Sequence, residues 1–259
     1  MRGAAGIVLV AALCVLASCG DDSDDDALPA PPATGTWSVG QTGGQERWPG
    51  DNTNQQPDPV DPEQANLTEI KNELKEYHDD GLYEQDLLSM AVQAQECMLE
   101  AATDAERPAL VLDIDETALS NYEWMVQVDF LRGSPMLADL FAAHADEANS
   151  PPIEPVLDLY EAARENGIAV FFITGRREPL REVTEENLRN AGYDDFEQVY
   201  FAPPEYDDPS IVPFKSGVRA DIEEQGYTIV ANVGDQDSDL EGGHAQCPHK
   251  LVDPYYFIP

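Results

Sequence analysis

Short apolar runs that alternate with helical segments constrain the fold of this chain more than any other feature. The four runs cover residues 109–112, 168–173, 199–201 and 227–230. An amphipathic pattern over residues 82–104 precedes the first run, and the other three follow helical patterns that end in Gly167, Gly192 and Gly226. Glycine at such a position supplies the left-handed turn that ends a helix at little cost. The alternation predicts an α/β fold, a Rossmann-like parallel sheet flanked by helices.

The first 66 residues are not expected to join this fold. Residues 1–19 start with Met1-Arg2 and continue with a short apolar stretch. They end in Leu-Ala-Ser-Cys, which resembles the lipobox of bacterial lipoprotein signals. We expect cleavage before Cys19 and lipid on that cysteine, with an ordinary signal peptide cut after a small residue as the alternative. In both cases the mature chain leaves the cytosol. The lipidated form would be anchored to a bacterial membrane, at the cell surface or on the periplasmic face.

Residues 20–66 are acidic, rich in proline and glycine, and without apolar periodicity. Such a composition buries too little apolar surface to offset the entropy of ordering the chain, so it predicts a disordered tether. Residues 67–259 then form one folded domain, for which a hydrophobic content of 42% is sufficient.

The net charge excludes one class of partner. The chain has 14 Lys+Arg and 51 Asp+Glu, which gives a formal charge of −37. Nucleic acids gain affinity from basic residues that neutralise their phosphates, so we expect no nucleic-acid partner. Because Lys215 is one of only four lysines, its position in the sequence is informative.

Chemically active side chains follow each apolar run. They are Asp113 and Asp115 after the first run, Thr174, Gly175 and Arg176 after the second, Lys215 at a helix start beyond the third, and Asp235, Asp237 and Asp239 after the fourth. Open parallel sheets form their sites beyond the carboxyl ends of the strands, so these side chains are expected to converge on one edge.

Clustered carboxylates repel one another unless a cation lies between them. Oxygen ligands suit Mg²⁺, and a divalent ion with a lysine and a hydroxyl suits phosphoryl transfer. A carboxylate can also serve as the nucleophile and form an aspartyl-phosphate. The sequence therefore favours a magnesium-dependent enzyme that acts on phosphate esters.

Four segments resemble motifs I to IV of the haloacid dehalogenase (HAD) superfamily. They are Asp113-Ile-Asp-Glu-Thr, Ile173-Thr-Gly-Arg176, Lys215-Ser216 and Gly234-Asp235-x-x-x-Asp239. Longer strings around them resemble the acid phosphatase branch (class B and class C-like, subfamily IIIB), in its bacterial lipoprotein form. The resemblance spans about residues 67–259 and implies the HAD fold with a small helical cap inserted after the first strand.

The resemblance also implies a role for each residue. Asp113 would be the nucleophile, and Asp115 would be the general acid and then the general base. Mg²⁺ would be held by the carboxylates of Asp113 and Asp235 and by the backbone carbonyl of Asp115. Thr174, Gly175 and Lys215 would bind the phosphoryl group. Asp239 would orient a metal-bound water, while Asp237 either replaces it or faces solvent, and Arg176 either binds substrate or balances nearby acids.

About fifty residues separate the first two motifs, more than a crossover helix needs, so residues 119–150 are expected to form the cap. Tyr122, Trp124 and Phe130 are candidates for contacting the leaving group, which would be a nucleotide or aryl group if they stack on it. Packing of these aromatic side chains inside the cap is the alternative interpretation.

Two cysteines remain in the mature domain once Cys14 leaves with the signal and Cys19 carries lipid. Cys97 and Cys247 are an even pair in an oxidising compartment, which predicts a disulfide. The four histidines lack metal-ligand spacing and the Arg-His-Gly signature of histidine acid phosphatases, which argues against zinc or phosphohistidine chemistry.

The resulting hypothesis is a Mg²⁺-dependent acid phosphatase that hydrolyses small phosphomonoesters. A phosphotransferase using the same intermediate and a non-catalytic surface or storage protein on the same fold are the alternatives. The sequence does not determine the natural substrate or the oligomeric state.

Overall fold

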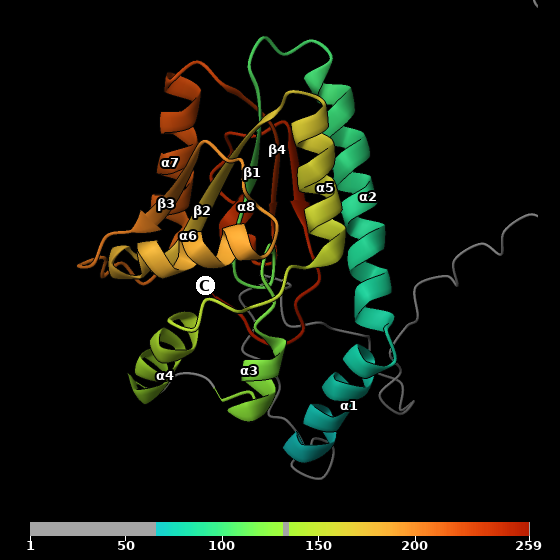
Figure 1. The fold of residues 1–259 in the computed structure, drawn as a ribbon, viewed down its shortest axis with the longest axis vertical. Helices are drawn as coiled ribbons and strands as arrows, with labels where there is room; N and C mark the ends of the chain where they lie inside the picture. The colour runs from blue at the N-terminus through green and yellow to red at the C-terminus, as the bar shows by residue number, and fades with distance from the viewer. Residues whose placement is uncertain (1–65, 132–134, 259) are drawn as a thin grey trace, which may run out of the picture. The chain divides into compact units, whose positions relative to one another are not determined.

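The computed structural model describes residues 66–131 and 135–258, so the expected signal peptide with Cys19 and nearly all of the expected tether lie outside it. The described domain contains a sheet of five parallel strands in the order β3-β2-β1-β4-β5 (Figure 1). Their bounds are β1 Pro108–Leu112, β2 Ala169–Arg177, β3 Gln198–Ala202, β4 Thr228–Gly234 and β5 Cys247–Lys250. The predicted parallel α/β architecture is confirmed.

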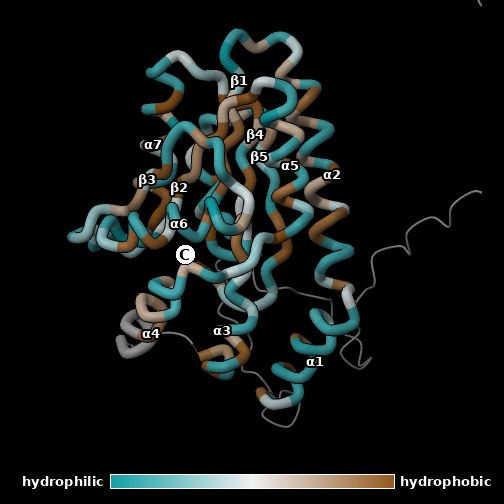
Figure 2. The backbone as a smooth tube through the Cα atoms, in the orientation of Figure 1, coloured by the Kyte–Doolittle hydropathy of each residue, from teal (hydrophilic) through white to brown (hydrophobic). Residues whose placement is uncertain are grey.

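Helices cover both faces of the sheet. On one face α2 (Leu82–Ala102) and α5 (Glu154–Glu165) lie side by side, and α6 (Arg181–Asn190) adds Leu188 to the same core (Figure 1). On the other face α7 (Val212–Glu224) packs Val218 and Ile222 against the strands. The strands are the apolar centre of this arrangement, and the outer helix faces are polar (Figure 2).

The strand order creates a switch point beside β1. From β1 the chain moves through β2 to β3, and then returns through α7 to β4 on the opposite side of β1. The connections that leave β1 and β4 therefore run in different directions, and parallel sheets place their sites at such a point. Asp113 directly follows β1 and Asp235 directly follows β4, so both acids lie at the switch point.

Four of the strands were predicted, but their ends differ from the apolar runs. The second strand extends to Arg177 and the fourth to Gly234, so each includes part of its motif. The fifth strand was not predicted, because Cys-Pro-His-Lys has no apolar alternation. Its proline is tolerated because β5 lies at the edge of the sheet.

The long insertion after β1 contains two short helices, α3 (Tyr122–Gln127) and α4 (Pro135–Ala145), beyond the carboxyl edge of the sheet (Figure 1). Two of its aromatic side chains pack inward. Tyr122 stacks on His78 of α1 (Leu67–Asp79) with ring centroids 3.4 Å apart, and Phe130 stacks on Tyr255 at 5.9 Å. The packing interpretation therefore holds for Tyr122 and Phe130.

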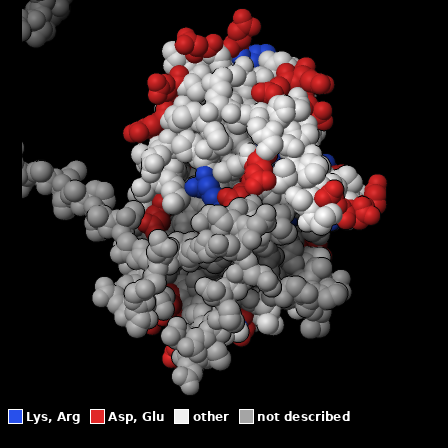
Figure 3. Space-filling view, turned by 180° about the vertical axis from the view of Figure 1, so that it is seen from behind, with Lys and Arg blue, Asp and Glu red and all other residues white. Residues whose placement is uncertain are grey.

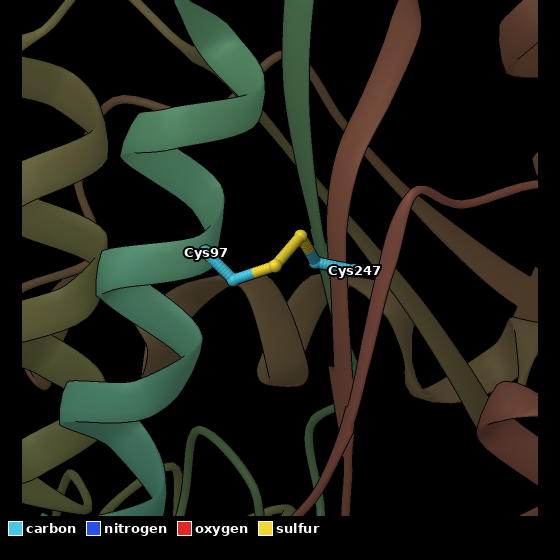
Figure 4. Close-up of a disulfide and its surroundings, with 2 residues drawn as sticks. All are labelled: Cys97 and Cys247. Carbon is cyan, nitrogen blue, oxygen red and sulfur yellow. A yellow bond between two sulfur atoms is a disulfide. The ribbon is translucent and has the colours of Figure 1, made fainter.

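The predicted disulfide between Cys97 and Cys247 is present. It joins α2 to β5 across 150 residues of sequence, with Cα atoms 6.2 Å apart (Figure 4). The bridge fixes the edge strand to the helix layer that covers one face of the sheet. Within residues 66–131 and 135–258, no helix has the length and apolar character needed to cross a bilayer.

Candidate active site

Asp113 and Lys215 form the centre of the candidate site. Asp113 directly follows β1, and Lys215 lies in the first turn of α7. The Lys215 ammonium donates to Asp113 Oδ1 at 2.6 Å and also to Asp239 Oδ1. All three side chains are buried. Because one ammonium group bridges two carboxylates from separate loops, the predicted convergence of motifs I, III and IV is confirmed by this geometry.

Asp239 is held in place by its surroundings. Its Oδ2 accepts from the backbone amide of Gln236 at 2.9 Å, and its backbone carbonyl accepts from Arg219 at 2.6 Å and from Asn232 at 2.9 Å. A Cβ atom at position 234 would collide with the Asp239 carboxylate, so glycine is required there. Both carboxylate oxygens of Asp239 thus bind protein donors, which suits an orienting role.

Asp115 is engaged by a buried arginine. The Arg176 guanidinium donates to Asp115 Oδ1 through Nη2 at 2.7 Å and to Oδ2 through Nε at 3.1 Å. Arg176 Nη1 also donates to Thr184 at 3.1 Å. Burial alone would raise the pKa of Asp115, but Arg176 holds this pKa below its ordinary value. Of the two interpretations of Arg176, the structure places it as the partner of an acid.

Thr174 and Gly175 lie at the same edge, within β2. The register between β2 and β3 shifts after Thr174, so Gly175 and Arg176 form an irregularity that redirects the strand. The Thr174 hydroxyl accepts from the Arg176 amide at 3.0 Å, which leaves its O–H to donate. Gly175 is exposed, so its backbone is accessible to a ligand.

Asp235 is oriented by two partners. The Thr117 hydroxyl donates to its Oδ1 at 3.0 Å, and the Gln236 side chain donates to its Oδ2 at 2.5 Å. The sequence identified Thr117 as a member of motif I but did not predict that it contacts Asp235. It gave no indication that Gln236 belongs to the site. Asp237, whose role was left open, forms a half-exposed ion pair with Lys250 at 2.7 Å and does not join the cluster.

Glu116 and Asn121 are two site residues for which sequence reasoning proposed no role. Asn121 donates to Asp115 Oδ1 at 2.8 Å through its side chain and to Glu116 at 2.6 Å through its backbone amide. Glu116 is buried, and burial raises its pKa to about 8. Glu116 stands within motif I and Asn121 follows it four residues after Thr117. This proximity to the motif was the only signal in the sequence, because the contacts of both residues depend on the loop conformation.

The carboxylate cluster is suited to a divalent cation. One oxygen from each of Asp113, Asp235 and Asp239 lies within 4.8 Å of the others, and Lys215 is the ammonium that contacts two of them. Burial raises the pKa of Asp113 to about 7, against the opposing effect of Lys215, and raises the pKa of Asp235 well above its ordinary value. Three buried acids with one lysine carry uncompensated charge, and an oxygen-only donor set fits a hard divalent ion.

A cavity of about 420 Å³ lies between α3 and α4. Trp124, His144 and Asn121 line it, and the Trp124 and His144 rings are stacked with centroids 5.6 Å apart. Since Asn121 also contacts Asp115, one residue separates this cavity from the predicted acid. Of the three aromatic candidates for the leaving group, Trp124 is the one that lines this cavity.

The four motifs lie at the carboxyl edge of one parallel α/β sheet, and the chain matches a known family of such domains. Residues 45–259 match the family described as HAD superfamily, subfamily IIIB (Acid phosphatase). The chain belongs to this family.

Two plant proteins and one solved structure illustrate the similarity. Acid phosphatase 1 of Solanum lycopersicum is 34% identical over 157 residues, 60% of this chain and 61% of that protein. Vegetative storage protein 1 of Arabidopsis thaliana is 30% identical over 149 residues, 58% of this chain and 55% of that protein. The chain thus spans about three fifths of these relatives.

The class C acid phosphatase from Bacillus anthracis has the same fold. It superposes with a TM-score of 0.57 at 20% identity and covers 73% of this chain and 86% of its own. The predicted α/β fold of the HAD type is confirmed.

Proposed function

We propose that this protein is a Mg²⁺-dependent acid phosphatase that hydrolyses small phosphomonoesters through an aspartyl-phosphate. The observation that carries the proposal is the bridge from Lys215 to Asp113 and Asp239. In this bridge the Lys215 ammonium contacts Asp113, and both residues lie at the carboxyl edge of the sheet near its switch point. Family membership supports the same reaction class.

The reaction would proceed in two steps. In the first, a carboxylate oxygen of Asp113 forms a bond to phosphorus while the ester P–O bond breaks, and Asp115 gives a proton to the leaving oxygen. Because Arg176 lowers the pKa of Asp115, the protonated form that this step needs becomes more abundant as the pH falls. In the second, water attacks phosphorus, Asp115 takes the proton, and the bond to Asp113 breaks to release phosphate. Arg176 and Asn121 fix Asp115 for both transfers.

Lys215, Thr174 and Gly175 would bind the phosphoryl group. The Lys215 ammonium neutralises charge next to Asp113, and the Thr174 hydroxyl and Gly175 amide donate to phosphoryl oxygens. Asp113, Asp235 and the Asp115 carbonyl would hold Mg²⁺, with Asp239 orienting a ligand. When bound, the ion would stabilise the charge that develops on the phosphoryl group.

Three parallel assays of p-nitrophenyl phosphate hydrolysis test this proposal. Activity should require Mg²⁺, disappear with EDTA and return when Mg²⁺ is restored. Asp113→Asn should lower kcat by about 10³-fold or more, because the amide is a poor nucleophile. Asp237→Asn is the matched control, since that acid follows β4 close to Asp235 but pairs with Lys250, and it should retain activity.

Equal rates in all of these assays would refute the proposed enzymatic activity and favour a non-catalytic surface or storage protein. A phosphotransferase would reveal itself by a phosphorylated alcohol when acceptor alcohols are added, because it shares the same intermediate. Mass spectrometry of protein quenched during turnover should show phosphate on Asp113.

We also propose that the protein acts outside the cytosol, anchored through lipid on Cys19. The proposal comes from residues 1–19, which lie outside the described part of the chain. The Cys97–Cys247 disulfide supports it, because such bonds persist in oxidising compartments. Labelling of cells with a radioactive fatty acid should mark the wild type and leave Cys19→Ala unmarked.

A further inference from the structure

The segment that follows β5, residues 251–258, lies against the candidate site; we name it the C-terminal strap. It is fixed on one side by apolar packing. The Tyr255 ring contacts Tyr83 of α2 and Tyr122 of α3, with centroids 5.3 and 5.5 Å apart. The next residue, Tyr256, instead turns its hydroxyl toward the loop after β1. The strap therefore connects the aromatic packing of the cap with the polar site.

The first contact of the strap is with Gln236. Gln236 Nε2 donates to Asp253 Oδ2 at 2.7 Å and to Asp235 Oδ2 at 2.5 Å, and its Oε1 accepts from the Ile258 amide at 2.9 Å. The strap thus hydrogen-bonds to both the nitrogen and the oxygen of the Gln236 side-chain amide. Since that amide contacts one carboxylate oxygen of Asp235 and Thr117 contacts the other, the strap helps to fix the position of this carboxylate.

The second contact is with Glu116, which lies in motif I. Glu116 has a φ of 56°, a left-handed conformation that is unfavourable for this residue type. Such strain persists only where the surroundings impose it. The Tyr256 hydroxyl donates to Glu116 Oε2 at 2.8 Å, and the Asn121 amide donates to Oε1 at 2.6 Å. The strap therefore helps to hold the loop that carries Asp113 and Asp115 in its strained form.

We propose that Asp253 and Tyr256 are positioning residues for the divalent cation. Asp253 acts through Gln236 on Asp235, and Tyr256 acts through Glu116 on the loop that carries Asp113. The inference rests on the proposed function, because it assumes the cation site described above. Side chains that orient metal ligands typically change metal affinity by about 10- to 100-fold when they are removed.

Calorimetric titration of Mg²⁺ into the metal-free full chain tests the proposal without an activity assay. Asp253→Ala and Tyr256→Phe should each weaken Mg²⁺ binding about 10-fold. Tyr160→Phe is the matched control. Tyr160 lies on α5, and its hydroxyl accepts from the Asp195 backbone amide at 2.8 Å. Removing this hydroxyl should leave the affinity for Mg²⁺ unchanged. Urea unfolding of each variant checks that the domain is folded.

A double-mutant cycle separates positioning from a general charge effect. In a Gln236→Ala background, Asp253→Ala should cause little further loss, because its effect passes through the missing amide. An equal loss in both backgrounds, or unchanged affinity in Asp253→Ala and Tyr256→Phe, would overturn the positioning role. Failure of the wild type to bind Mg²⁺ would overturn the cation site of the proposed function and the strap proposal with it.

Discussion

Two partners restrain the carboxylate of Asp115 from different parts of the chain. Arg176 reaches it from β2, and Asn121 reaches it from the start of α3. A group that must give and take a proton at one position benefits from such restraint, because proton transfer requires hydrogen-bond distance to the reacting oxygen. The same Asn121 lines the cavity beside Trp124, so a single residue contacts both Asp115 and the cavity in which a leaving group could bind.

Trp124 is the residue at which substrate preference can be tested. If an aryl leaving group stacks in the cavity, Trp124→Ala should raise KM for p-nitrophenyl phosphate about 3- to 10-fold and leave kcat nearly unchanged. Steady-state kinetics measure both constants. Phe130→Leu provides the comparison, because Phe130 packs against Tyr255 and should not affect KM. An unchanged KM in Trp124→Ala would place the leaving group elsewhere.

Among the elements, the edge strand β5 depends most on covalent support. It has four residues, contains a proline, and pairs with β4 alone. The disulfide to α2 closes a loop of 150 residues, and cross-links of long loops restrict the unfolded chain strongly. We expect Cys97→Ala with Cys247→Ala to lower the free energy of unfolding by about 2–5 kcal/mol, measured by urea denaturation.

Reductant serves as the control for this prediction. Reduction should lower the urea midpoint of the wild type to that of the double variant, and it should not change the midpoint of the double variant. A wild-type midpoint that does not move on complete reduction would show that the bridge adds no stability.

The elements that could be predicted are those whose signal is local. Apolar runs ending before Asp113 and Asp235 located β1 and β4, and the geometry of parallel strands then brought both acids to one edge. The β5 strand and the strap could not be predicted in this way. Tyr256 meets Glu116 only because β5 pairs with β4, and no residue pattern near either position encodes that pairing.

The molecule as a whole carries far more acid than base. Its formal charge is −37, and on the face shown in Figure 3 acidic side chains predominate over basic ones. This field opposes the approach of an anionic substrate, so Lys215 and the proposed cation must reverse the potential locally. The self-repulsion of the surface acids also acts against the folded state.

Salt should therefore stabilise this protein. Raising NaCl from about 0.01 M to 0.5 M shortens the screening length several-fold and weakens the repulsion between surface acids. We expect Tm to increase over this range, as measured by calorimetry at pH 7. The increase should shrink near pH 4, where carboxylates begin to take up protons. A Tm that is flat or falls with salt at pH 7 would contradict this interpretation.

The strand order has a consequence for how the chain is made. Among the strands of the described domain β1 is synthesised first, yet one of its two neighbours, β4, begins only at Thr228. Until the chain has emerged past that point, from the ribosome or from an export channel, β1 presents an edge with unpaired backbone groups, and the loop that carries Asp113 lacks the acids that follow β4. A partly emerged chain can therefore contain Asp113 without the acids that complete the candidate site, and its exposed edge is the surface that a chaperone would have to cover.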